Sequence, residues 1–159
     1  MKYIIIIFNL LITMSLSNAQ IKVYKGKSKY STDIICNLNK GKVYKKNSTY
    51  YTADVICNIR GNKIYKGTSS YSSDVIYTIK DGCVYKGNSS YRQDIIMTIK
   101  DGKIYKGVST YSSDVIATIK DLKVYKENST YNNDIMFTID DYVSLEEFVA
   151  IWHVITYVF

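Results

Sequence analysis

The stretch "DGKIYKGVSTYSSDVIATIK", residues 101–120, follows a close copy of itself, "DGCVYKGNSSYRQDIIMTIK", at residues 81–100. Self-similarity at a fixed period is typical of repeat architectures, in which each unit buries its apolar face against its neighbours. The repeat therefore decides the fold. Six units follow one another, with boundaries near 21–40, 41–61, 62–81, 82–101, 102–121 and 122–141.

Each unit is predicted to contain two β-strands. In the unit quoted first they are residues 103–106 and 115–120, which are rich in β-branched and aromatic side chains. The chain of 159 residues has no proline, so nothing interrupts a ladder of backbone hydrogen bonds. A two-residue turn such as Asp101-Gly102 joins one unit to the next and favours a type I′ hairpin. Leu122 makes the last of these turns the weakest, because leucine resists a positive φ.

The two-residue turn also fixes which residues face each other. Lys100 should lie opposite Lys103, Ile99 opposite Ile104, and Thr98 opposite Tyr105. Because side chains alternate between the faces of a strand, the opposite face should carry Ile96, Thr98, Lys100 and Lys103, with Tyr105 of the next unit lying over Thr98. The predicted core face comprises Ile34, Cys36, Leu38, Val55, Cys57, Ile59, Val75, Tyr77, Ile79, Ile95, Met97, Ile99, Ile104, Val115, Ala117, Ile119, Ile135, Phe137 and Ile139.

The first and last strands lack a partner in this pattern. Pairing residues 22–25 with residues 135–139 would close the sheet and remove both unpaired edges. We therefore expect an all-β fold of about six two-stranded repeats in a closed ring or barrel-like arrangement, with an open solenoid as the alternative.

The last segment, "SLEEFVAIWHVITYVF", predicts one C-terminal α-helix. Ser144 and Glu147 form a capping box, and the helix should run from about Leu145 to Tyr157. Apolar residues at helical spacing, among them Phe148 and Trp152, indicate one buried side. We expect a plug or cap on the repeat core; a membrane-interface or partner-docking helix is the alternative. We therefore expect three divisions of the chain: a signal peptide at residues 1–19, the repeat domain at residues 20–141, and the helix that packs on it at residues 142–159.

The opening segment, "MKYIIIIFNLLITMSLSNAQ", has the pattern of a secretory signal peptide. Lys2 precedes an apolar run, and Ser17 and Ala19 suit a cleavage site after Ala19. We therefore expect export to the periplasm, the cell surface or the medium, and no transmembrane span in the mature chain. The net charge of +7 is uneven: residues 20–139 carry +10 and residues 140–159 carry −4. Lysine recurs at fixed repeat positions, which favours solvated strand ends over binding to anionic polymers or lipid headgroups. We expect no nucleic-acid partner.

The pattern "GKIYKG…TYSSDVIATIKDG" resembles the short hairpin repeats of bacterial four-fold beta-flower proteins across roughly residues 21–139. The resemblance implies hairpin units set around an axis and carries no catalytic residues. This chain has six such units rather than four, and a terminal helix.

Few side chains suggest chemistry, and we predict no catalytic residue, no cofactor and no metal site. His153 is the only histidine and stands in an apolar helix. Cys36 and Cys57 occupy equivalent core positions, so a disulfide and two buried thiols both remain open, since bridged Cα atoms lie within about 7 Å. Cys83 is expected to be an exposed thiol. The six aspartates at 33, 54, 74, 94, 114 and 134 are expected to fix loops rather than to bind cations.

The tyrosine rows are the best candidates for binding. A first tyrosine, always followed by lysine, recurs once per unit, and a second follows at 30, 50, 71, 91, 111 and 131. The predicted polymer-binding residues are Tyr65, Tyr85, Tyr105, Tyr125, Lys86 and Lys106. The sequence thus predicts an exported, non-enzymatic repeat protein with a structural or interaction role at the cell envelope. The alternative is a module that binds a polysaccharide or another envelope polymer through tyrosine, lysine and serine.

Overall fold

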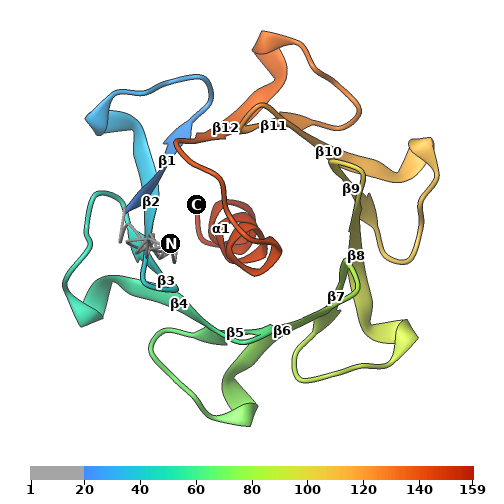
Figure 1. Ribbon diagram of the computed structural model, residues 1–159, viewed down its shortest axis with the longest axis horizontal. Coiled ribbons are helices and arrows are strands. Elements are labelled where there is room, and N and C mark those ends of the chain that lie inside the picture. The colour runs from blue at the N-terminus through green and yellow to red at the C-terminus, as the bar shows by residue number, and fades with distance from the viewer. Residues whose placement is uncertain (1–19) are drawn as a thin grey trace, which may run out of the picture.

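Twelve antiparallel strands form a closed barrel around one helix in the computed structural model, which describes residues 20–159 (Figure 1). The expected signal peptide lies outside these residues. Odd and even strands alternate as the first and second strands of the six units. The strands are β1 Ile21–Lys25, β2 Ile34–Asn39, β3 Lys42–Lys45, β4 Val55–Arg60, β5 Lys63–Lys66, β6 Val75–Lys80, β7 Cys83–Lys86, β8 Ile95–Lys100, β9 Lys103–Lys106, β10 Val115–Lys120, β11 Lys123–Lys126 and β12 Ile135–Ile139.

The predicted closure of the ring is confirmed. β1 pairs with β12, with Val23 opposite Ile139. The backbone N–H of Lys22 also donates to the Asp140 carboxylate at 2.7 Å. The sheet therefore has no free edge at which another chain could add a strand.

The hairpin turns adopt the expected left-handed backbone. Asp101 and Gly102 have φ of 50° and 71°, and a Cβ atom built on Gly102 would lie 3.0 Å from the Ile119 carbonyl oxygen. Leu122 occupies the corresponding position of the last turn with φ 61°, a conformation that disfavours residues with a Cβ atom. This turn therefore forms against the preference of its own residue.

The predicted register is confirmed within each hairpin but shifts between the two strands of one unit. Thr98 lies opposite Tyr105 as predicted. Ile104 then pairs with Ala117 while Tyr105 pairs with Val115, so Ile116 is an extra residue in the ladder. The same shift recurs in all six units. Such a bulge reverses the alternation of side chains beyond it.

This bulge corrects the predicted core at one position in every unit. The first residue of each second strand pairs with the outward tyrosine and is absent from the interior cluster, contrary to prediction. The next residue packs on the interior instead in five units, so the placement of Ile96 on the outer face was wrong. The outward residues are Ile34, Val55, Val75, Ile95, Val115 and Ile135; the inward ones are Ile35, Ile56, Ile76, Ile96 and Met136.

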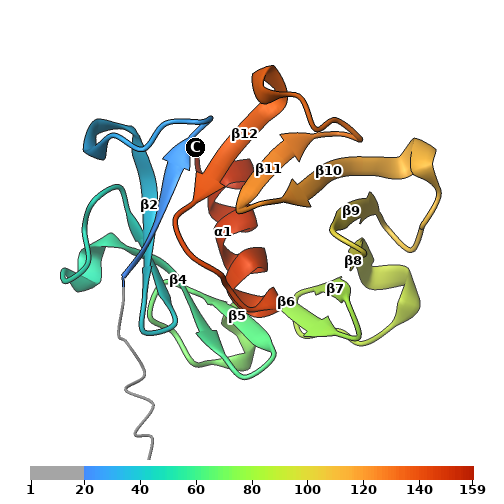
Figure 2. The same cartoon turned by 45° about the horizontal axis from the view of Figure 1, so that its top comes forward.

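The predicted plug is confirmed, because α1 (Leu145–Tyr157) lies inside the barrel (Figures 1 and 2). Its capping box is present, with Ser144 Oγ accepting from the Glu147 N–H at 3.2 Å. The helix is buried on several sides rather than one, because the barrel surrounds it. Its buried residues are Phe148, Val149, Ala150, Ile151, Trp152 and Val154. Within residues 20–159, no helix has the length and apolar character needed to cross a membrane.

Helix and barrel meet through side chains that differ from unit to unit. The Phe137 ring lies 6.3 Å from the Trp152 ring, and the Cys57 thiol lies 4.0 Å from the Ala150 carbonyl oxygen. Burying a large apolar side chain contributes roughly 1.5–3 kcal/mol, so this contact supplies much of the stability.

Candidate functional site

The loops that join the two strands of each unit project outward around the barrel like petals (Figure 1). All six leave the same end, because the hairpin turns occupy the other end. Each contains a short 3₁₀ helix that starts just after a tyrosine and ends at an aspartate. We call them petals 1 to 6: residues 26–33, 46–54, 67–74, 87–94, 107–114 and 127–134.

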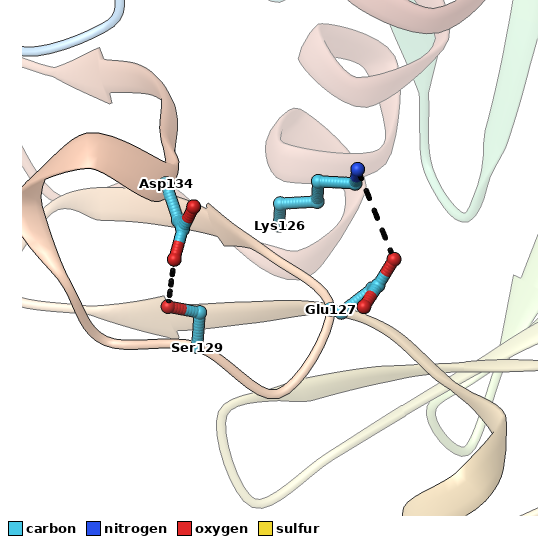
Figure 3. Close-up of polar contacts among 4 residues, drawn as sticks. All are labelled: Lys126, Glu127, Ser129 and Asp134. Carbon is cyan, nitrogen blue, oxygen red and sulfur yellow. Dashed lines mark hydrogen bonds and ion pairs between the residues drawn. The ribbon is translucent and has the colours of Figure 1, made fainter.

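One serine holds each petal in shape. In petal 6 the Ser129 hydroxyl donates to the Asp134 carboxylate at 2.5 Å and accepts from the Tyr131 N–H at 3.1 Å (Figure 3). The serine–aspartate bond is present in all six petals. A hydrogen bond to a charged acceptor is stronger than one between neutral groups, so this bond fixes the loop. The expectation that the aspartates fix the loops is confirmed.

A buried polar contact ties each petal to the preceding unit. The Thr98 hydroxyl, directed outward from β8, donates to the Gly107 carbonyl oxygen of petal 5 at 2.7 Å. The equivalent Thr138 donates to the Gly26 carbonyl oxygen across the closure of the ring. Asparagine makes this contact in the first two units, where Asn58 donates to the Gly67 carbonyl oxygen at 2.8 Å. The petals are therefore anchored on both sides.

The anchored petals present exposed tyrosines. Tyr111 and Tyr131 are 76% and 78% exposed, although the backbone around them is hydrogen-bonded. Tyr111 lines a hollow of about 680 Å³ together with Lys106, Ser109 and Asp114, and petals 1 and 6 form similar hollows. An aromatic face beside hydrogen-bond donors and acceptors on a rigid loop suits a ligand with both apolar faces and hydroxyl groups.

The structure separates the tyrosines that we predicted to bind. Tyr105 and Tyr125 are only 9% and 5% exposed, while Tyr65 and Tyr85 are half-buried. Binding at these four residues stays a prediction, but their burial favours the second tyrosine row. The sequence did contain a signal for the exposed row: the second tyrosine of each unit stands in a polar loop, whereas the first stands in a strand.

The predicted lysines are exposed, at the ends of β7 and β9. Lys106 lies in the hollow with Tyr111 rather than with the buried Tyr105. In petal 2 the structure places Tyr51 rather than Tyr50 in the repeated position. The backbone carbonyl oxygen of Tyr51 accepts a hydrogen bond from the Asp54 N–H, as the carbonyl oxygen of the tyrosine does in the other petals. The extra residue of the second unit therefore precedes the repeated tyrosine.

The remaining candidate groups are buried or isolated. Cys36 and Cys57 are free thiols on β2 and β4, with β3 between them. Neighbouring strands lie about 4.8 Å apart, so two spacings separate these strands by roughly 9–10 Å, beyond the Cα distance of about 7 Å that a disulfide spans. Burial raises the pKa of Cys57 to about 12, so its thiol is protonated at neutral pH. Cys83 is half-buried rather than exposed as predicted, because its sulfur lies 3.9 Å from the Thr98 hydroxyl.

His153 is part of the contact between helix and barrel. Its Nδ1 atom lies 3.0 Å from the Tyr77 hydroxyl, and the two rings meet edge to face. Burial lowers the pKa of His153 and raises that of Tyr77 to about 12, so both groups are neutral at pH 7. No group of three potential metal-ligating side chains occurs in the part of the chain that the structure describes.

The architecture defines a class of protein: a repeat barrel of six hairpins closed around a helix, with one petal per hairpin. The profile of the 6-fold beta flower protein family matches residues 23–152. The chain belongs to this family, and the four-fold arrangement implied by the sequence resemblance is corrected to six-fold. No curated protein and no solved structure matches the chain.

Proposed function

We propose that this repeat protein is exported, is not an enzyme, and acts at the cell envelope by binding a repetitive polymer through its six petals. The observation that carries the proposal is the exposed tyrosine held in the same anchored loop in all six units. Tyrosine faces stack on sugar rings, while lysine and aspartate bond hydroxyl groups, so a glycan is the ligand class that the petals favour.

Six equivalent weak sites suit a polymer better than a small molecule. Once one petal is occupied, the next repeat of the polymer binds as an intramolecular event at a high effective concentration. The total affinity can then exceed that of one petal by a factor of roughly 10² to 10⁴. This argument requires only that neighbouring petals point outward around the ring, as they do in Figure 1.

Co-sedimentation with purified peptidoglycan and with envelope polysaccharides tests the binding. We expect a variant with alanine at all six petal tyrosines, residues 30, 51, 71, 91, 111 and 131, to lose roughly 100-fold in affinity or more. The matched control is Tyr142→Ala, since Tyr142 is 83% exposed but lies outside the petals. Equal binding by the two variants would contradict a role of the petals, and failure of the wild type to bind any polymer would contradict glycan recognition.

Export is tested separately. We expect the protein recovered from the envelope or the medium to begin at Gln20 in N-terminal sequencing. A chain that keeps Met1 and stays inside the cell would contradict export while leaving the binding test unaffected.

A further inference from the structure

One position makes petal 4 different from the other five. The residue directly after the petal tyrosine begins the 3₁₀ helix, and in petal 4 this residue is Arg92. The other petals have short, uncharged residues there, namely Ser31, Thr52, Ser72, Ser112 and Asn132. Since serine starts the same 3₁₀ helix in three petals, the fold does not require an arginine at this position. Arg92 therefore contributes something other than the shape of petal 4.

Arg92 connects two neighbouring petals. It is exposed and lines the hollow of about 680 Å³ together with Lys106, Ser109 and Tyr111 of the next unit. The hollows at petals 1 and 6 are each lined by residues of a single unit. Petals 4 and 5 follow each other around the ring (Figure 1), so they form one joint site. Its volume falls in the range of small-molecule sites, roughly 300–1,000 Å³.

The joint site is positively charged. Arg92 and Lys106 are the cations among its lining residues and Asp114 is the one carboxylate, so two positive charges and one negative charge leave +1. That carboxylate already accepts a hydrogen bond from the petal serine. The rest of petal 4 and the lysine before it add Asp94 and Lys86, whose charges cancel. Neither end of the chain lines the site, so the terminal charges do not alter this count.

The Arg92 guanidinium is available to a ligand. Among residues 20–159 the one ion pair joins Lys126 to Glu127 (Figure 3), so no carboxylate lies within ion-pair distance of Arg92. A guanidinium presents a planar fork of N–H donors that binds a carboxylate at two points. The Tyr111 ring, 76% exposed, offers an aromatic face in the same hollow. A sugar that carries a carboxylate matches both groups.

We infer that the joint site of petals 4 and 5 binds an acidic sugar of the uronic-acid class. The carboxylate of the sugar pairs with the Arg92 guanidinium and the Lys106 ammonium group, and its ring lies against Tyr111. One carboxylate balances the net charge of +1. The other petals lack the arginine, so they add affinity for the polymer while this site selects an acidic one. The inference rests on the proposed function, because it names the ligand class at one of the petal sites.

Titration with trigalacturonate tests the ligand class, with its methyl ester as the matched neutral ligand. A trisaccharide is used because binding across six petals would hide the contribution of one site. Amide chemical shifts from two-dimensional NMR, recorded at about 0.15 M salt, report the affinity and the place of binding. We expect the acid to bind roughly tenfold more tightly than the ester, because the ester lacks the charge-assisted hydrogen bonds. The largest shifts should fall in petals 4 and 5.

The outcomes separate this inference from the proposed function. Equal affinities for the acid and the ester would overturn the acidic ligand class and leave glycan binding by the petals standing. Binding of neither trisaccharide would also overturn the inference. Only if the polymers in the co-sedimentation test fail to bind as well would glycan recognition fall with it.

Matched variants assign the preference to Arg92. Arg92→Ser gives petal 4 the residue of petal 3 and should abolish the preference for the acid over the ester. The control is Arg60→Ser, which removes the same charge from an exposed position at the hairpin-turn end of β4 and should leave the preference unchanged. Equal losses in the two variants would reduce the effect to net charge and contradict the site.

Moving the arginine tests the pairing of neighbouring petals. The double variant Arg92→Ser, Ser72→Arg places the guanidinium on petal 3, next to Lys86 and Tyr91 of the following unit. We expect the preference for the acid to return and the largest shifts to move to petals 3 and 4. A double variant without this preference would contradict a site built from one arginine and the next petal.

Discussion

The interior of the barrel and the petals differ in how closely the six units resemble one another. The serine–aspartate pair is the same in all six petals. The central inward position of the second strand, by contrast, differs in almost every unit. It is occupied by Cys36, Cys57, Tyr77, Met97, Ala117 and Phe137.

The reason for the difference is the helix. An α-helix has no six-fold symmetry, so each strand around it meets different atoms: Phe137 meets Trp152, and Tyr77 meets His153. Each petal instead meets the same neighbours, namely its own barrel strands and the preceding unit. Residues with identical surroundings can stay identical, whereas residues around an asymmetric plug must differ in volume to fill the space.

The largest single effect is expected in the interior. Phe137→Ala should lower the free energy of unfolding by about 3–5 kcal/mol, because it removes a fully buried ring and leaves a cavity. Urea unfolding followed by Trp152 fluorescence measures this value. The control is Tyr131→Ala in a petal, which should change it by less than about 0.5 kcal/mol. Similar losses in the two variants would argue against the division into interior and petals.

An intermediate effect is expected inside the petals. Ser109→Ala removes the donor to the Asp114 carboxylate and should cost about 1–2 kcal/mol. The sharper test is its equality with Ser69→Ala, since the Ser69–Asp74 bond has the same length of 2.5 Å. Costs differing by more than about 1 kcal/mol in urea unfolding would show that the petals are not equivalent.

The smallest effect concerns the hairpin turns. Leu122→Gly should raise the free energy of unfolding by about 0.5 kcal/mol, because glycine relieves the positive φ but loses more entropy on folding. The reverse comparison, Gly102→Ala, should lower it by about 1 kcal/mol, since the new Cβ would lie 3.0 Å from the Ile119 carbonyl oxygen. A destabilised Leu122→Gly variant would mean that the leucine side chain contributes more than its backbone costs.

Much of the barrel could be predicted, because short sequence motifs and their repetition determine its strands, turns and register. Asp-Gly turns fix the hairpin register, the count of units gives twelve strands, and Ser144 with Glu147 marks the start of the helix. Closure followed from two strands without partners. These predictions needed only residues that are close in sequence or repeated along it.

The errors concern which side chains face inward and which are exposed, because these depend on packing between strands rather than on local motifs. Strict alternation placed Val115 inside, but the bulge at Ile116 turns Val115 outward against Tyr105. The strand tyrosines chosen for binding also pair with this outward residue and are half-buried or buried. Neither the bulge nor the path of the petal leaves a distinct pattern in a single unit.

The most direct test of the account exchanges residues between units without changing composition. The double variant Ala117→Phe, Phe137→Ala should lose about 4 kcal/mol or more in urea unfolding, because a cavity forms beside Trp152 and β10 becomes overcrowded. The matched exchange in two petals, Val108→Asn with Asn128→Val, should change stability by less than about 0.5 kcal/mol. An interior exchange as neutral as the petal exchange would show that the helix does not dictate the sequence of the barrel around it.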